Sequence, residues 1–122
     1  MKTITKIALS TLLVIVFPVF LFAQPQVTIT PPKGEPAAVI SIDGKGFKPD
    51  EEIDIIITLD EGEKVGLGTE KVDVIKADAN GVFSVKSGIP INAKPGKHKI
   101  EIIGNKGSII ETFVEVTPKE KK

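Results

Sequence analysis

The 122-residue sequence contains no cysteine, arginine, tryptophan or tyrosine. Without cysteine the chain cannot form a disulfide, so packing and strand pairing alone must hold it together. Without arginine it lacks the side chain that grips phosphate through two parallel hydrogen bonds, and its 16 basic residues are matched by 16 acidic ones. The missing tryptophan and tyrosine remove the aromatic platforms that commonly hold sugars. These absences argue against nucleic-acid and carbohydrate binding.

The first 23 residues have the pattern of a secretory signal peptide. Lys2 and Lys6 precede an almost uninterrupted apolar run from Ile7 to Ala23, and a polar Gln-Pro-Gln follows. We predict cleavage after Ala23; an uncleaved anchor is the alternative, although the run is a little short for the ~20 residues of a membrane span. Cleavage leaves 14 lysines against 16 acidic residues in 24–122. The predicted location is secreted, cell-surface or periplasmic, without membrane contact after cleavage.

Residues 24–117 have the pattern of one all-β domain. Short runs in which apolar and polar side chains alternate are separated by Pro, Gly and Asn, which is typical of strands and turns. In the clearest run, Ile53, Ile55, Ile57 and Leu59 share one face. About seven short strands predict an immunoglobulin-like antiparallel β-sandwich, followed by a charged tail at 118–122. The predicted strands are 27–30, 37–43, 52–59, 69–78, 82–91, 98–104 and 108–117, with 31–36 and 60–68 as connections.

The dipeptide Asn80-Gly81 lies between two of these runs and predicts a hairpin with a type I′ turn, because both residues tolerate positive φ. The oxygens of Asp78 and Asn80 could instead serve as metal ligands. We favour the turn.

Four segments, taken in order, resemble the bacterial immunoglobulin-like domains of secreted and cell-surface proteins. They are VISIDGKGFKPDEEIDI, ADANGVFSV, IPINAKPGKHKIEIIG and FVEV, and the resemblance extends from Val27 to Val116. It implies a β-sandwich and a role in protein interaction or adhesion. The family's glycine after the proline is Asp50 here, so we expect Asp50 to adopt positive φ.

Residues 44–55, GKGFKPDEEIDI, are interpreted as a connection between two strands. Gly44 and Gly46 release the chain from the first strand, Phe47 enters the core, and Ile53 begins the next buried face. We therefore expect Phe47→Ala to cost ~3 kcal/mol or more, and Glu51→Gln to be nearly silent.

The acidic side chains around this connection could bind Ca²⁺, which prefers several oxygen ligands at one point. The alternative is a solvated strand end whose charges protect the rim of a sheet. We favour that alternative, because residues 52 and 54 share one strand face and residue 51 lies on the other. The acidic residues concerned are Asp50, Glu51, Glu52 and Asp54, with Asp60, Glu61 and Glu63 beyond the far end of the strand.

No catalytic, cofactor-binding or metal-binding residue is predicted, and we expect no enzyme activity. His98 is the single histidine, is expected near the surface and lacks a partner for general base catalysis. The serines lack a G-x-S-x-G context; they include Ser41, Ser84, Ser87 and Ser108.

The sequence therefore predicts a non-catalytic exported module whose partner is another protein, bound through a sheet edge or loops. The alternative is a structural subunit of an extracellular filament that assembles through its N-terminal strand, residues 24–30.

Overall fold

The computed structural model describes residues 24–68 and 74–119. The predicted signal peptide, residues 1–23, lies outside the described residues, as do residues 69–73 of one predicted strand. The elements are β1 Gln26–Thr30, β2 Lys33–Gly34, β3 Val39–Lys45, β4 Glu52–Thr58, a 3₁₀ turn η1 Asp60–Gly62, β5 Lys64–Leu67, β6 Ile75–Lys76, β7 Phe83–Gly88, β8 Gly96–Gly104 and β9 Ile109–Val116.

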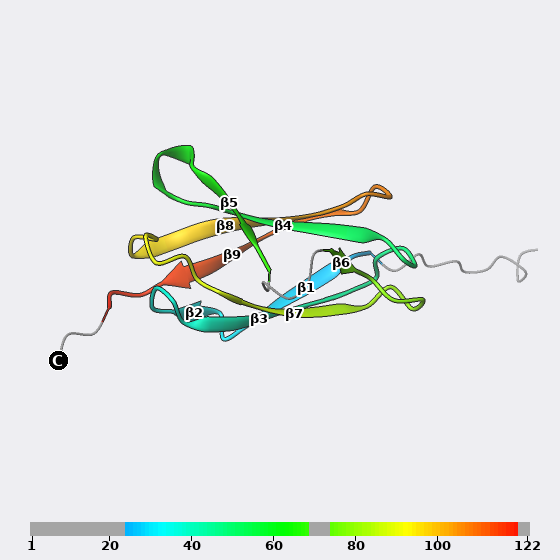
Figure 1. The fold of residues 1–122 in the computed structure, drawn as a ribbon, viewed down its shortest axis with the longest axis horizontal. Coiled ribbons are helices and arrows are strands. Elements are labelled where there is room, and N and C mark those ends of the chain that lie inside the picture. Colours follow the sequence, from blue (N-terminus) through cyan, green and yellow to red (C-terminus); the bar gives the residue numbers. More distant parts are fainter. Residues whose placement is uncertain (1–23, 69–73, 120–122) are drawn as a thin grey trace, which may run out of the picture.

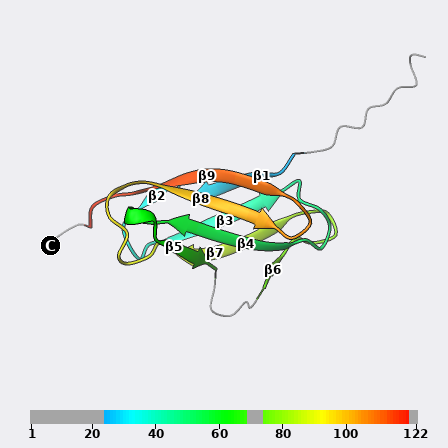
Figure 2. The same cartoon turned by 90° about the horizontal axis from the view of Figure 1, so that it is seen from above.

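Two sheets pack face to face, as Figure 1 shows. The smaller sheet has the order β1-β3-β7, and the larger has the order β2-β9-β8-β4-β5, with β6 also paired to β4. This arrangement confirms the predicted all-β, immunoglobulin-like sandwich. One pair departs from the expected antiparallel pattern, because β2 runs parallel to β9. Viewed from above, β9 forms one long side of the larger sheet and β5 lies toward the other (Figure 2).

Alternating isoleucines build the core between the sheets. Ile55 and Ile57 of β4 lie opposite Ile102 and Ile100 of β8, and each of these four side chains is at most 2% exposed. Because β-branched side chains are stiff and fit a pleated surface, this alternation favours strands and fills the core together. Complete burial of each such side chain contributes roughly 1.5–3 kcal/mol, so the core can hold the domain without disulfides.

Two short strands were missed in the sequence analysis. β2 lies within the proline-rich 31–36 connection, where Lys33 and Gly34 pair with the last two residues of β9. Proline interrupts pairing only at its own nitrogen, and the Pro32 carbonyl accepts from Glu115 N at 3.1 Å. β5 lies within the Gly-rich 60–68 connection and pairs with β4. Along the chain that the structure describes, no helix is long and apolar enough to cross a membrane.

Candidate functional site

Phe47 lies in the core, as predicted. Its side chain is 5% exposed, and its ring meets the Phe83 ring edge-on at 5.1 Å between centroids. Gly44 leaves room for that pair, because a Cβ there would lie 2.2 Å from a Phe83 ring carbon. Asp50 has φ 60°, which confirms the expected left-handed turn. The connection between β3 and β4, residues 46–51, is therefore fixed by packing near its start and by backbone geometry near its end.

The burial of Glu51 contradicts the interpretation made from the sequence. Glu51 was assigned to a solvated strand end, yet it is 0% exposed. Its Oε1 accepts from Lys48 N at 3.0 Å and from the Ser108 hydroxyl at 2.7 Å. Its Oε2 accepts from Lys106 N at 2.9 Å and from Ser108 N at 3.0 Å. The carboxylate thus joins the β3–β4 connection to the turn between β8 and β9.

The hydrogen bonds to Glu51 determine its charge state. Burial alone raises the pKa of a carboxyl group, but the Ser108 hydroxyl and the three backbone N–H donors lower the pKa of Glu51 to about 2. The group therefore remains ionised at neutral pH and has no proton to donate. Gly104 admits the side chain, because a Cβ there would lie 2.2 Å from Oε2. Glu51 thus has a structural role, and we refer to its carboxylate with the hydrogen-bond donors of Lys48, Lys106 and Ser108 as the clasp.

The clasp joins residues that are distant in the chain, so no local sequence pattern indicates it. Gly104 and Ser108 were assigned to the predicted strands 98–104 and 108–117; Gly104 does end β8, whereas Ser108 lies one residue before the start of β9. One sequence feature could have indicated that Glu51 is buried. Glu51 lies on the opposite strand face from the exposed Glu52 and Asp54, immediately before a strand of the sandwich.

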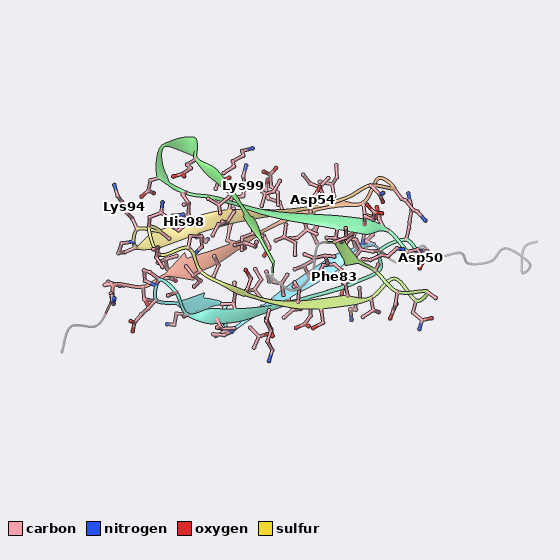
Figure 3. All side chains as sticks on the ribbon, in the orientation of Figure 1. Asp50, Asp54, Phe83, Lys94, His98 and Lys99 are labelled. Atoms are coloured by element: carbon pink, nitrogen blue, oxygen red, sulfur yellow. The ribbon has the colours of Figure 1, made fainter. Side chains whose placement is uncertain are left out.

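The other acidic side chains are exposed and divided between the two ends of β4. Asp50, Glu52 and Asp54 lie toward one end, while Asp60 and Glu63 lie beyond the other; nothing is described of the Glu61 side chain. Figure 3 places Asp50 at the opposite end of the sandwich from Lys94, which lies 4.0 Å from Asp60. Among the residues with described side chains, no group of three or more acids and histidines converges as a metal site would require.

The turn at Asp78–Gly81 differs from the predicted hairpin. Gly81 has φ 76°, but Asn80 does not have positive φ, so the turn is not type I′. The flanking strands also pair elsewhere, β6 with β4 and β7 with β3, and the turn therefore connects the two sheets. Asp78 Oδ1 accepts from Asn80 N at 2.8 Å and from Val82 N at 3.0 Å, so this oxygen stabilises the turn.

His98 is buried, contrary to the expected surface position. It is 5% exposed, with Nδ1 3.0 Å from the Thr58 carbonyl oxygen and Nε2 2.7 Å from that of Lys94. A neutral ring carries one N–H and can donate to one of the two carbonyls. Through these two carbonyls the ring joins the β7–β8 loop to the end of β4, and Figure 3 shows Lys94 and His98 at the same end of the sandwich.

The serines also make structural contacts. Ser108 completes the clasp, Ser84 Oγ donates to Asp43 Oδ1, and Ser87 Oγ accepts from Gly68 N at 3.1 Å. Ser41 is half-buried in β3.

The hollow beside the clasp has a volume of about 600 Å³ and includes Pro25, Phe47 and Ile109 in its lining, with Lys48 as its single titratable side chain among the described residues.

The fold defines the protein as an immunoglobulin-like β-sandwich module. The family model of the macroglobulin-like domain matches residues 23–114, and the chain belongs to that family. No curated protein sequence matches it. The sequence motifs had pointed to an immunoglobulin-like sandwich, and the fold bears this out at the level of architecture.

Several solved structures match this chain at low sequence identity. Macromomycin is 14% identical, with 76% of this chain and 99% of that chain covered and a TM-score of 0.55. A superoxide reductase (neelaredoxin) from Ignicoccus hospitalis is 14% identical, with 79% of this chain and 80% of that chain covered and a TM-score of 0.49. The sporulation control protein Spo0M from Bacillus subtilis is 10% identical, with 84% and 51% covered and a TM-score of 0.44. The similarity to macromomycin supports the fold and carries no information about function.

Proposed function

We propose that this macroglobulin-like chain is an exported, non-catalytic module that binds another protein at the cell surface or outside the cell. The observation that carries the proposal is the outer side of β9, which presents large apolar side chains to solvent. Ile109 is 67% exposed and Phe113 is 39% exposed. The leader-like pattern of residues 1–23 supports export, and the family supports a modular role.

The face around these residues mixes apolar and charged groups. Ile109 lies directly opposite the half-buried Ile103 of β8. Lys99 Nζ lies 3.7 Å from Glu111 Oε2, and Lys97 Nζ lies 5.1 Å from the centre of the Phe113 ring. Aromatic and apolar side chains surrounded by polar groups are the usual composition of a protein–protein interface.

Cross-linking of the exported fraction tests the proposal. A lysine-reactive reagent added to intact producing cells should join this chain, through Lys97 or Lys99, to a second exported protein that mass spectrometry identifies. The isolated chain should begin at Gln24. Retention of the chain inside the cell, or adducts made only of copies of itself, would contradict the proposal.

The position of β1 favours a second candidate, the filament subunit. β1 ends the smaller sheet and pairs through five residue pairs with β3 of its own chain. β1 contributes two side chains to the core: Ile29, which is 9% exposed, and Val27, which is half-buried. A neighbouring subunit could supply the same strand, and the exchange would then propagate. Filaments in negative stain that disappear when residues 24–30 are deleted would favour this candidate, whereas a monomer by light scattering would exclude it.

A further inference from the structure

We propose that the outer edge of β9 binds an extended peptide segment as an added strand, and that the segment carries a basic residue flanked at both second neighbours by apolar residues. This inference rests on the proposed binding function and specifies where the partner binds and what its chemistry is. Strand addition combines main-chain hydrogen bonds, which give affinity, with side-chain complementarity, which gives specificity.

The register of β9 shows which backbone groups are available. Gly104 N donates to the Ser108 carbonyl at 2.7 Å, so even-numbered residues of β9 bond to β8 in this antiparallel ladder. The odd-numbered residues therefore direct their N–H and C=O groups away from β8. Glu115 N confirms this direction, because it donates to the Pro32 carbonyl on the far side.

β2 pairs with only one end of this edge, and β1 of the smaller sheet also passes close to β9 without pairing with it. β2 pairs with Glu115 and Val116 and stops there. The backbone groups of Ile109, Glu111 and Phe113 have no strand partner among residues 24–68 and 74–119. An added strand of about five residues fits this length, between the turn before β9 and the start of β2.

The exposed side chains along the edge define the partner. Ile109, Glu111 and Phe113 alternate on the outer face, so along the strand the Glu111 carboxylate lies between two apolar groups, while Lys99 of β8 lies 3.7 Å from it on the other side. Directly opposite residues of an added strand lie in contact with the β9 side chains, and opposite charges stabilise such pairs. A second copy pairing about a twofold axis at Glu111 would bring two carboxylates together, which is unfavourable. The charge pattern therefore favours a basic partner over this self-pairing.

A peptide titration of the purified protein tests the inference. The probe is acetyl-Val-Thr-Lys-Thr-Val-amide, raised to millimolar concentration, and the control peptide carries Glu in place of Lys. Backbone amide NMR shifts should change at the odd positions 109, 111 and 113, and the Glu peptide should bind about fivefold more weakly.

Two variants separate the backbone from the charge. Glu111→Pro removes an N–H that points to the edge, where proline is tolerated, and should abolish binding, whereas the matched Glu111→Ala should retain weakened binding. Glu111→Lys should reverse the preference between the two peptides, which keeps the test decisive if the proline variant unfolds.

Equal binding of the two peptides, shifts at β1 or β7 in place of β9, or no shift at all would overturn the inference. Any of these outcomes of the peptide titration would leave the proposed function, which the cross-linking experiment tests, unaffected. Failure of that cross-link, with the peptide still binding β9, would instead contradict the proposed function.

Discussion

Replacement of Glu51 by glutamine tests the clasp at the end of the sandwich. The pKa of this group falls from 4.5 to about 2 in the folded protein, and each unit corresponds to about 1.4 kcal/mol. We therefore expect Glu51→Gln to lower the free energy of unfolding at pH 7 by about 3–4 kcal/mol. The amide also places its NH₂ group among the N–H donors of Lys48, Lys106 and Ser108, which adds to the loss.

The pH dependence of this effect has a definite sign. Because the pKa of Glu51 is lower in the folded state than in the unfolded state, the stabilisation is fully present above about pH 5 and is lost as the pH falls toward 2. Urea unfolding should therefore show a large gap between the wild-type protein and Glu51→Gln at pH 7, and a small gap near pH 2.

The neighbouring Glu52 provides the matched control, because its side chain is exposed. Glu52→Gln should change stability by less than about 0.5 kcal/mol at either pH. A Glu51→Gln variant as stable as the Glu52→Gln control at pH 7, or a gap that does not shrink on acidification, would refute the clasp.

Three further substitutions test the same region by thermal or urea unfolding. Phe47→Ala should cost ~3 kcal/mol or more, since it removes a buried ring; a loss below about 1 kcal/mol would mean that Phe47 is not core. Gly104→Ala should destabilise by about 2 kcal/mol or more because its Cβ meets Glu51, whereas Gly66→Ala, with no atom closer than 4.0 Å to its Cβ, should be mild. Equal losses would refute the steric argument. Asp50→Gly should be neutral or stabilising by up to about 1 kcal/mol, because it relieves a φ of 60°; a marked loss would show that the Asp50 side chain contributes more than the strain costs.

The elements that could be predicted are those with local signals. Alternating Ile53, Ile55 and Ile57 specify both a strand and its buried face, and Phe47 follows a glycine-rich turn into the core. β2 and β5 were missed because their pairing is decided by the neighbouring strand rather than by their own composition. Their Pro- and Gly-rich sequences favour turns locally.

The buried polar contacts could not be predicted for a related reason. Glu51 is buried because the turn at 104–108 surrounds its carboxylate, and His98 is buried because the carbonyls of Thr58 and Lys94 face its ring. Each contact joins segments that are adjacent only after the sheets form. Composition and periodicity describe which residues prefer water, and they do not reveal a distant hydrogen-bonding partner.

Binding of another protein by the outer side of β9 can be tested with a photoreactive amino acid at position 109. The group would be activated in living producing cells, with the same group at position 66 on the opposite edge as the control. We expect one discrete adduct with a different exported protein from position 109 and none from position 66. Adducts composed only of copies of this chain, or equal cross-linking from both edges, would contradict it.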